Sequence, residues 1–205
     1  MLRSPAEATR LDLAVPGKRE TYDRRVLERL GVSVAGHEVL NIHRIGIDAP
    51  PELVWDELQH WSPDGGYWPG GIVRGQWEGE GLEHGSIRLL GLSFLPLFRL
   101  DLVRRQETPP PTDPDRARYV LYRCSGGYPI GVFSIYVRAR IVAEGEVEPT
   151  QMFFMVSFDF FGRKHWLGTR AVRPLWESIH DRVTSQVLNR FKAHCQEARA
   201  RRGGA

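Results

Sequence analysis

The fold of this chain is decided by the stretch VRPLWESIHDRVTSQVLNRFKAHCQEA, residues 172–198. Large apolar residues recur in it every three or four positions, with charged residues between them, which predicts one long amphipathic helix. At about 1.5 Å per residue, such a helix is roughly 40 Å long. Its apolar stripe therefore needs a partner larger than a short helix, and we expect a β-sheet. The stripe consists of Val172, Trp176, Ile179, Val183, Val187 and Phe191.

The sheet is predicted from the middle of the chain, where segments of strand length alternate with turn sequences. Each segment is rich in branched or aromatic residues, and stretches rich in glycine, proline and acidic residues separate them. Short connections between consecutive strands favour antiparallel pairing. We therefore expect seven antiparallel strands, which cover residues 39–48, 72–78, 86–92, 97–107, 116–124, 131–144 and 150–161.

The last predicted strand, residues 150–161, is apolar on both faces. Phe154 and Phe158 would lie on one face, and Phe153 and Met155 on the other. Both faces of this strand therefore need cover. A sheet that curls around the long helix leaves apolar residues that a single helix cannot cover, so we expect a hydrophobic cavity.

The chain divides into three parts. Residues 1–37 form an N-terminal extension, in which 1–17 are predicted to be a mobile polar arm and 18–30 a short helix. Residues 38–198 form one domain. Its first helix starts at the prolines of DAPPELVWDELQHW, residues 48–61, because the first turn of a helix does not need the N–H that proline lacks. Residues 199–205 are predicted to be a disordered basic tail.

The order of these elements resembles the helix-grip fold. The stretches IDAPPELVWDELQHW, residues 47–61, and EGLEHGSIRLL, residues 80–90, are similar to the first helix and the second hairpin of the bacterial polyketide cyclase/dehydrases. The resemblance extends over residues 38–198 to the START-like (SRPBCC) superfamily, which includes lipid-transfer START domains and birch-pollen allergens. It implies an α+β fold in which a seven-stranded curved antiparallel sheet wraps around a long C-terminal helix. The superfamily shares a hydrophobic cavity but no universal catalytic motif.

Two features depart from this resemblance. The N-terminal extension is additional, and the approach to the last helix, DFFGRKHWLGTRAVRP at residues 159–174, is longer and more basic than the superfamily leads us to expect.

Composition narrows the classes of partner. The formal net charge is only +3, and the basic residues are scattered along the chain, so neither nucleic acid nor an anionic membrane is expected as the principal partner. The two cysteines do not form a disulfide framework. No apolar run is long enough for a signal peptide or a membrane span, which predicts a cytoplasmic protein without integral membrane association.

Sequence motifs of common enzyme classes are missing. The chain contains no GxSxG, Walker, GxGxxG or HExxH motif, so neither a nucleophilic triad nor a phosphate-binding loop is expected, and no cofactor is predicted. His60, His84 and His165 are isolated, and His37 and His43 are too far apart to chelate together, so no metal site is predicted.

The expected site lies between the sheet and the C-terminal helix. The primary hypothesis is binding of a hydrophobic small molecule or lipid, and the alternative is an enzyme of the polyketide cyclase/dehydrase type. In an enzyme, His180 and Asp159 would be the catalytic candidates, but the commoner role of such a group is that of a satisfied polar residue at the edge of the core. A second alternative is a protein-interaction module with a closed core. The expected ligand-binding residues are Trp176, Ile179, Val183, Val187, Tyr122, Phe133, Ile135, Phe158 and Ser157.

Overall fold

The computed structural model describes residues 8–10, 39–59, 73–78, 84–89, 99–107, 118–128, 130–139, 150–158 and 173–203. Each of the seven predicted strand segments overlaps an observed strand. The elements are β1 (Thr9–Arg10), β2 (Val39–Ile47), α2 (Pro51–Gln59), β3 (Val73–Glu78), β4 (His84–Leu89), β5 (Arg99–Glu107), β6 (Arg118–Gly126), β7 (Ile130–Ala139), β8 (Thr150–Phe158) and α3 (Arg173–Gly203).

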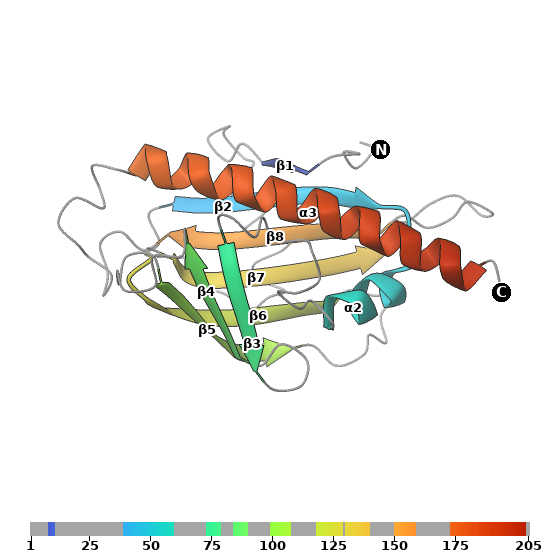
Figure 1. The fold of residues 1–205 in the computed structure, drawn as a ribbon, viewed down its shortest axis with the longest axis horizontal. Coiled ribbons are helices and arrows are strands. Elements are labelled where there is room, and N and C mark those ends of the chain that lie inside the picture. Colours follow the sequence, from blue (N-terminus) through green and yellow to red (C-terminus); the bar gives the residue numbers. More distant parts are fainter. Residues whose placement is uncertain are drawn as a thin grey trace.

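The strands form one antiparallel sheet in the order β1-β2-β8-β7-β6-β5-β4-β3. Figure 1 shows β3, β4 and β5 crossing the direction of β2, β8 and β7 at a steep angle, so the sheet is strongly curved. Helix α3 lies across the face that also carries α2. The predicted α+β architecture, a curved sheet closed by a long C-terminal helix, is confirmed.

The hydrophobic core lies between this face of the sheet and the two helices. Alternate residues of the central strands contribute to it, because successive side chains of a strand point to opposite faces. One buried cluster joins Ile45 of β2, Ile135 of β7 and Phe154 of β8 to Trp55 of α2 and Phe191 of α3. Strand β8 is buried at all nine positions, which confirms the prediction that both of its faces are covered.

Helix α2 begins at Pro51, as the sequence predicts for a proline in a first turn. The Val54 N–H donates to the carbonyl of Pro50 at 3.0 Å and closes that turn. The Thr150 hydroxyl donates to the carbonyl of Ala49 at 2.6 Å and holds the connection between β2 and α2 against the start of β8. On the sheet side, the guanidinium of Arg118 lies 4.2 Å from the centre of the Trp55 ring.

Helix α3 extends beyond its predicted end. It continues to Gly203, so the prediction of a disordered tail is wrong for residues 199–203. The reason is long-range pairing: the Arg199 guanidinium donates to the carbonyl of Asp48 at 2.9 Å and lies 2.8 Å from its carboxylate. Arg202 approaches Asp56 at 3.7 Å and Glu57 at 3.5 Å, which ties the last turn to α2.

The N-terminal extension supplies one strand more than the seven predicted. In β1, Thr9 pairs with Arg44 and Arg10 pairs with His43, so residues 9–10 form an edge strand where a mobile arm was expected. The Ala8 N–H donates to the side chain of Asn189 on α3 at 2.9 Å. The helix predicted for residues 18–30 lies outside the described residues.

Candidate functional site

A row of aromatic rings crosses the concave face of the sheet. Tyr122 of β6 pairs with Phe133 of β7, and their rings stack with centroids 5.4 Å apart and 15° between the planes. The Phe133 ring lies 4.4 Å from that of Phe154 on β8. All three side chains are buried among the apolar core. These rings therefore form a continuous apolar surface on the side of the sheet that α2 and α3 cover.

The row ends at two histidines. His180 of α3 lies 6.5 Å from Phe154 and 5.4 Å from Phe158, and the Phe158 ring meets it nearly at a right angle. The ring of His43 on β2 is 5.8 Å from that of His180. The Nε2 atom of His180 is 3.2 Å from the Thr184 hydroxyl, and the tautomer decides which of them donates. The site therefore changes from apolar to polar between β8 and β2.

The polar end is built mainly on β2. Asn41 and His43 occupy alternate positions of this strand and so share one face, and both are 0% exposed. The register pairs Asn41 with Val156 and His43 with Phe154, which places them on the face of the aromatic row. The Nε2 atom of His43 is 3.3 Å from Oδ1 of Asp181 on α3. This is a close electrostatic contact without hydrogen-bond geometry.

Helix α3 is buried unevenly along its length. Val183 and Ile179, in its N-terminal half, are only partly buried. Val183 lies about three turns before His194 and so on the same flank of the helix. His194 contacts Glu57 of α2 at 2.8 Å, so this flank faces the side of the sheet that carries α2. The tightly packed residues belong mostly to the C-terminal half and are Val187, Leu188, Phe191, Cys195 and Ala198.

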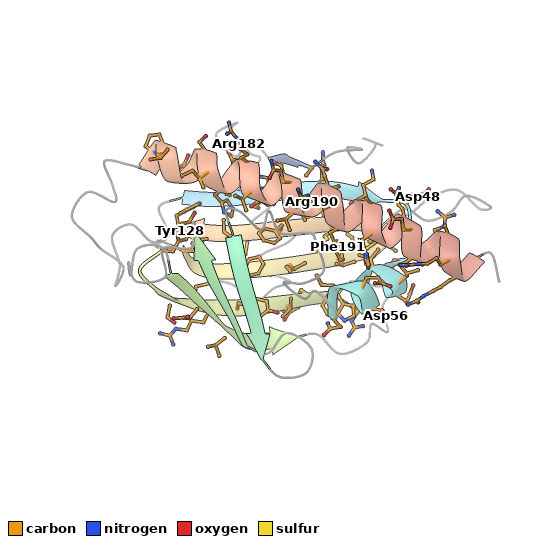
Figure 2. All side chains as sticks on the ribbon, viewed as in Figure 1. Asp48, Asp56, Tyr128, Arg182, Arg190 and Phe191 are labelled. Atoms are coloured by element: carbon orange, nitrogen blue, oxygen red, sulfur yellow. The ribbon has the colours of Figure 1, made fainter. Side chains whose placement is uncertain are left out.

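The C-terminal half of α3 is closed against α2 (Figure 2). Phe191 is 0% exposed. Beside it, His194 and Arg202 of α3 both contact Glu57 of α2. Burial raises the pKa of the Cys195 thiol, and the Glu57 carboxylate raises it further. The thiol is thus kept protonated and unreactive, so the C-terminal half of α3 and its contacts with α2 form part of the structural core.

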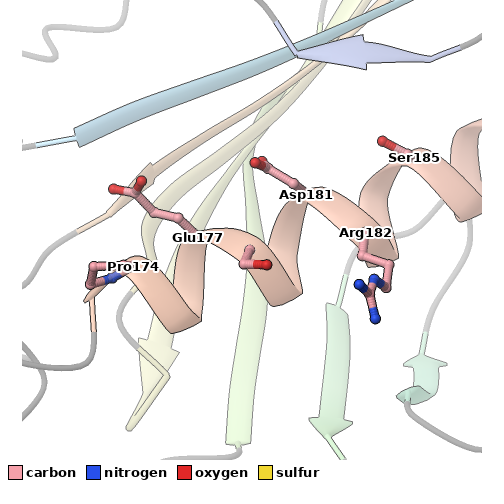
Figure 3. A pocket seen from close by; sticks show the side chains of 6 residues that line it. Pro174, Glu177, Asp181, Arg182 and Ser185 are labelled. Atoms are coloured by element: carbon pink, nitrogen blue, oxygen red, sulfur yellow. The ribbon is translucent and has the colours of Figure 1, made fainter.

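A polar groove follows the other flank of α3 (Figure 3). Asn189, which accepts the hydrogen bond from Ala8, lies about three turns after Ser178, so this flank faces the β1 edge of the sheet. The groove therefore lies outside the aromatic row, and among the described residues Asp181 links the two regions. The described residues that line it are Pro174, Glu177, Ser178, Asp181, Arg182 and Ser185.

The structure brings most of the predicted site residues together. His180, Val187, Tyr122, Phe133, Ile135 and Phe158 are buried around the aromatic row. Ser157 pairs with Leu40 on β2 and lies on the opposite face of β8, so it is not part of this group. Asp159 and the side chain of Trp176 lie outside what the structure describes.

Four residues of the site were missed by the sequence prediction. Thr184 and Phe154 lie within a helix and a strand that were predicted correctly, but the predicted site residues include neither of them. The prediction does not include Asn41 and His43, because the branched residues of β2 are what identify it as a strand. The available signal was alternation: Asn41 and His43 precede Ile45 and Ile47 at every second position, which places all four on one face.

Two further properties concern the described residues only. Neither α2 nor α3 combines the length with the apolar character that crossing a membrane requires. Within the same ranges, no three or more His, Cys, Asp or Glu side chains gather in a way that could hold a metal ion.

Comparison with known proteins gives similarity in structure alone. No protein-family model matches the chain, and no curated protein matches it. The solved structure of TTHA0849 from Thermus thermophilus has a TM-score of 0.50 at 10% identity and covers 78% of this chain and 99% of that one. The Zhui aromatase/cyclase from Streptomyces sp. R1128 has a TM-score of 0.49 at 18% identity, with coverage of 77% and 93%. Norcoclaurine synthase from Thalictrum flavum has a TM-score of 0.42 at 12% identity, with coverage of 74% and 84%.

Proposed function

We propose, from the premise that this chain has the helix-grip fold of START-like proteins, that it binds a hydrophobic small molecule or lipid between its sheet and α3. The observation that carries the proposal is the aromatic row from Tyr122 to Phe154, which ends at buried polar groups on β2 and α3. A surface of this kind suits a ligand with an apolar body and one polar end.

The uneven burial of α3 supports the same site. Its C-terminal half is held by the Phe191 packing and the contacts with α2. Its N-terminal half has two partly buried apolar side chains, Ile179 and Val183, on or near the flank that faces α2. Val183 packs at the margin of the core cluster. A ligand body that lies along the aromatic row would complete the burial of this flank, and removing apolar surface from water favours binding.

The test is a substitution that fills the proposed space. In Val183→Trp the indole would occupy the region next to the core cluster, while overpacking would cost about 1 to 3 kcal/mol of stability. We expect the wild type to bind anilinonaphthalene sulfonate or oleic acid saturably, and Val183→Trp to weaken this binding by about tenfold or more. Fluorescence titration, with native mass spectrometry for oleic acid, measures both.

The matched control is Gln186→Trp. Gln186 is exposed, so this substitution adds the same indole to α3 without placing it between the helix and the sheet. Equal affinity of the wild type and Val183→Trp would contradict the location of the site. A wild type that binds neither probe would contradict the function and favour the closed interaction module.

One observation favours the enzymatic alternative, a cyclase or dehydrase. His180 is 8% exposed, lies against the rings of Phe154 and Phe158, and is in hydrogen-bond contact with Thr184. An imidazole in this position could carry a proton to or from a bound carbonyl compound. Turnover of a panel of poly-β-ketones would establish this alternative, whereas binding without turnover supports the binding protein.

A further inference from the structure

The buried polar atoms on β2 lack hydrogen-bond partners. Both side-chain atoms of Asn41, Oδ1 and Nδ2, and both ring nitrogens of His43 are without such a partner among the described residues. Both side chains are 0% exposed. Buried polar groups in native proteins are nearly always paired, so a set of four such atoms on one strand face needs an explanation. A bound group that pairs with them is the explanation that the surrounding site favours.

The neighbouring carboxylate of Asp181 determines whether Nδ1 of His43 is a hydrogen-bond donor or acceptor. Asp181 Oδ1 lies 3.3 Å from Nε2 of His43, and a negative charge there favours the tautomer with its proton on Nε2. The Nδ1 atom then carries a lone pair and is a hydrogen-bond acceptor. Asn41 contributes two N–H donors and one carbonyl acceptor. The polar end therefore presents an acceptor and a donor at adjacent positions of the same strand face.

We propose that Asn41 and His43 form the polar subsite of the ligand site and that this subsite takes the hydroxyl group of a phenol, enol or alcohol; this inference rests on the proposed function. A hydroxyl donates to Nδ1 of His43 and accepts from an amide N–H of Asn41, so one group pairs with an atom of each residue. The apolar remainder of the ligand then lies along Phe154 and the rest of the aromatic row.

Other polar groups match less well. A ketone or an ether only accepts, which leaves Nδ1 of His43 without a partner. A carboxylate cannot donate to Nδ1 and adds a negative charge close to Asp181. An ammonium group donates to Nδ1 and to the Asn41 carbonyl, but it leaves the Asn41 N–H groups unsatisfied and buries a charge. A single hydroxyl supplies both a donor for Nδ1 of His43 and an acceptor for Asn41, and it buries no charge.

The subsite is closed in this structure. The polar atoms of Asn41 and His43 have no contact with solvent, so a hydroxyl reaches them only when the first turns of α3 move away from β2. That segment carries His180 and Asp181, whose ring and carboxylate lie against His43. Ligand entry is therefore expected to separate α3 from β2 before Thr184, while the contacts of the C-terminal half with α2 persist.

The experiment compares three probes that share one apolar body: β-naphthol, its methyl ether and naphthylmethylamine. Calorimetric titration of the wild type should give about tenfold tighter binding of the naphthol than of the ether, the effect of one additional buried hydrogen bond. Asn41→Leu and His43→Leu should each reduce this preference to about twofold or less, with the ether bound as before. Thermal melting of each variant confirms that it is folded.

The matched control is Ser157→Ala. Ser157 is also a buried polar residue without a hydrogen-bond partner among the described residues, but it lies on the other face of the sheet. Its removal should leave the naphthol preference unchanged. Equal binding of naphthol and ether by the wild type, a preference that persists in both β2 variants, or tighter binding of the amine would each overturn the hydroxyl subsite while the proposed function stands. Binding of none of the three probes by a protein that still binds oleic acid would also overturn the subsite, and binding of neither these probes nor oleic acid would overturn the proposed function itself.

Discussion

Truncation of Phe191 measures how firmly α3 closes the sheet. Phe191 is 0% exposed and belongs to the cluster that joins both helices to the sheet. Replacing a buried phenylalanine by alanine removes its transfer free energy and leaves a cavity, which together cost about 3 to 5 kcal/mol. The better helix propensity of alanine returns only about 0.5 kcal/mol. Because a domain of this kind has a total stability of about 5 to 15 kcal/mol, Phe191→Ala should remove a large part of it.

Urea denaturation followed by circular dichroism measures the loss. We expect a lower midpoint with an unchanged m-value, and a melting temperature reduced by about 6 to 20 °C, at about 2 to 4 °C for each kcal/mol in a chain of this length. The matched control is Leu175→Ala on the same helix, because Leu175 is 57% exposed and its truncation should change stability by less than about 0.5 kcal/mol. Equal effects of the two substitutions, or a loss below about 1 kcal/mol for Phe191→Ala, would refute the packing of α3 described above.

Three further predictions concern the C-terminal half of α3 and the two buried cysteines. Arg199→Ala should lower the free energy of unfolding by at most about 1 kcal/mol, and by less at high salt, because its partner Asp48 is 60% exposed. The control is Arg201→Ala, since Arg201 is exposed. Equal losses in the two variants would show that the Asp48 contact contributes nothing to stability. Cys124 and Cys195 are both buried, so Ellman's reagent should modify them only as the chain unfolds, and rapid reaction in native buffer would contradict this. Burial raises the pKa of the Cys195 thiol, so this group stabilises the fold fully below the ordinary thiol pKa of about 8.5 and less as the pH rises above it. Cys195→Ala should therefore reduce the loss of stability at alkaline pH.

The fold could be predicted because its elements are encoded locally. Strand β8 has large apolar side chains at both parities, and it is buried on both faces. The stripe of α3 has a helical period, and its members Val187 and Phe191 lie in the core. Turn residues mark the ends of most strands to within a few positions. These patterns depend on neighbours in sequence, so a single sequence is enough to detect them.

The end of α3 and the additional strand could not be predicted in this way. Residues 199–202 are one alanine and three arginines, which are good helix formers but do not continue the apolar stripe, and Gly203 then favours a helix end. They are helical because Arg199 and Arg202 pair with Asp48, Asp56 and Glu57, far away in the sequence. In the same way, Thr9 and Arg10 form a strand only because the edge of β2 is available to them. Pairings over such sequence separations leave no periodic signal.

The polar subsite illustrates why the site was harder to predict than the fold. One face of β2 carries Ile45 in the core cluster and also Asn41 and His43, which α3 covers at its less tightly packed end. A local pattern cannot tell which face of an isolated strand is buried, and only the register with β8 decides it. The difference between the tightly packed end of α3 and the polar subsite also separates effects on stability from effects on binding. Substitutions around Phe191 should appear mainly in the free energy of unfolding, whereas Asn41→Leu and His43→Leu should appear mainly in ligand preference, since replacing a buried polar group without a partner by an apolar one costs little stability.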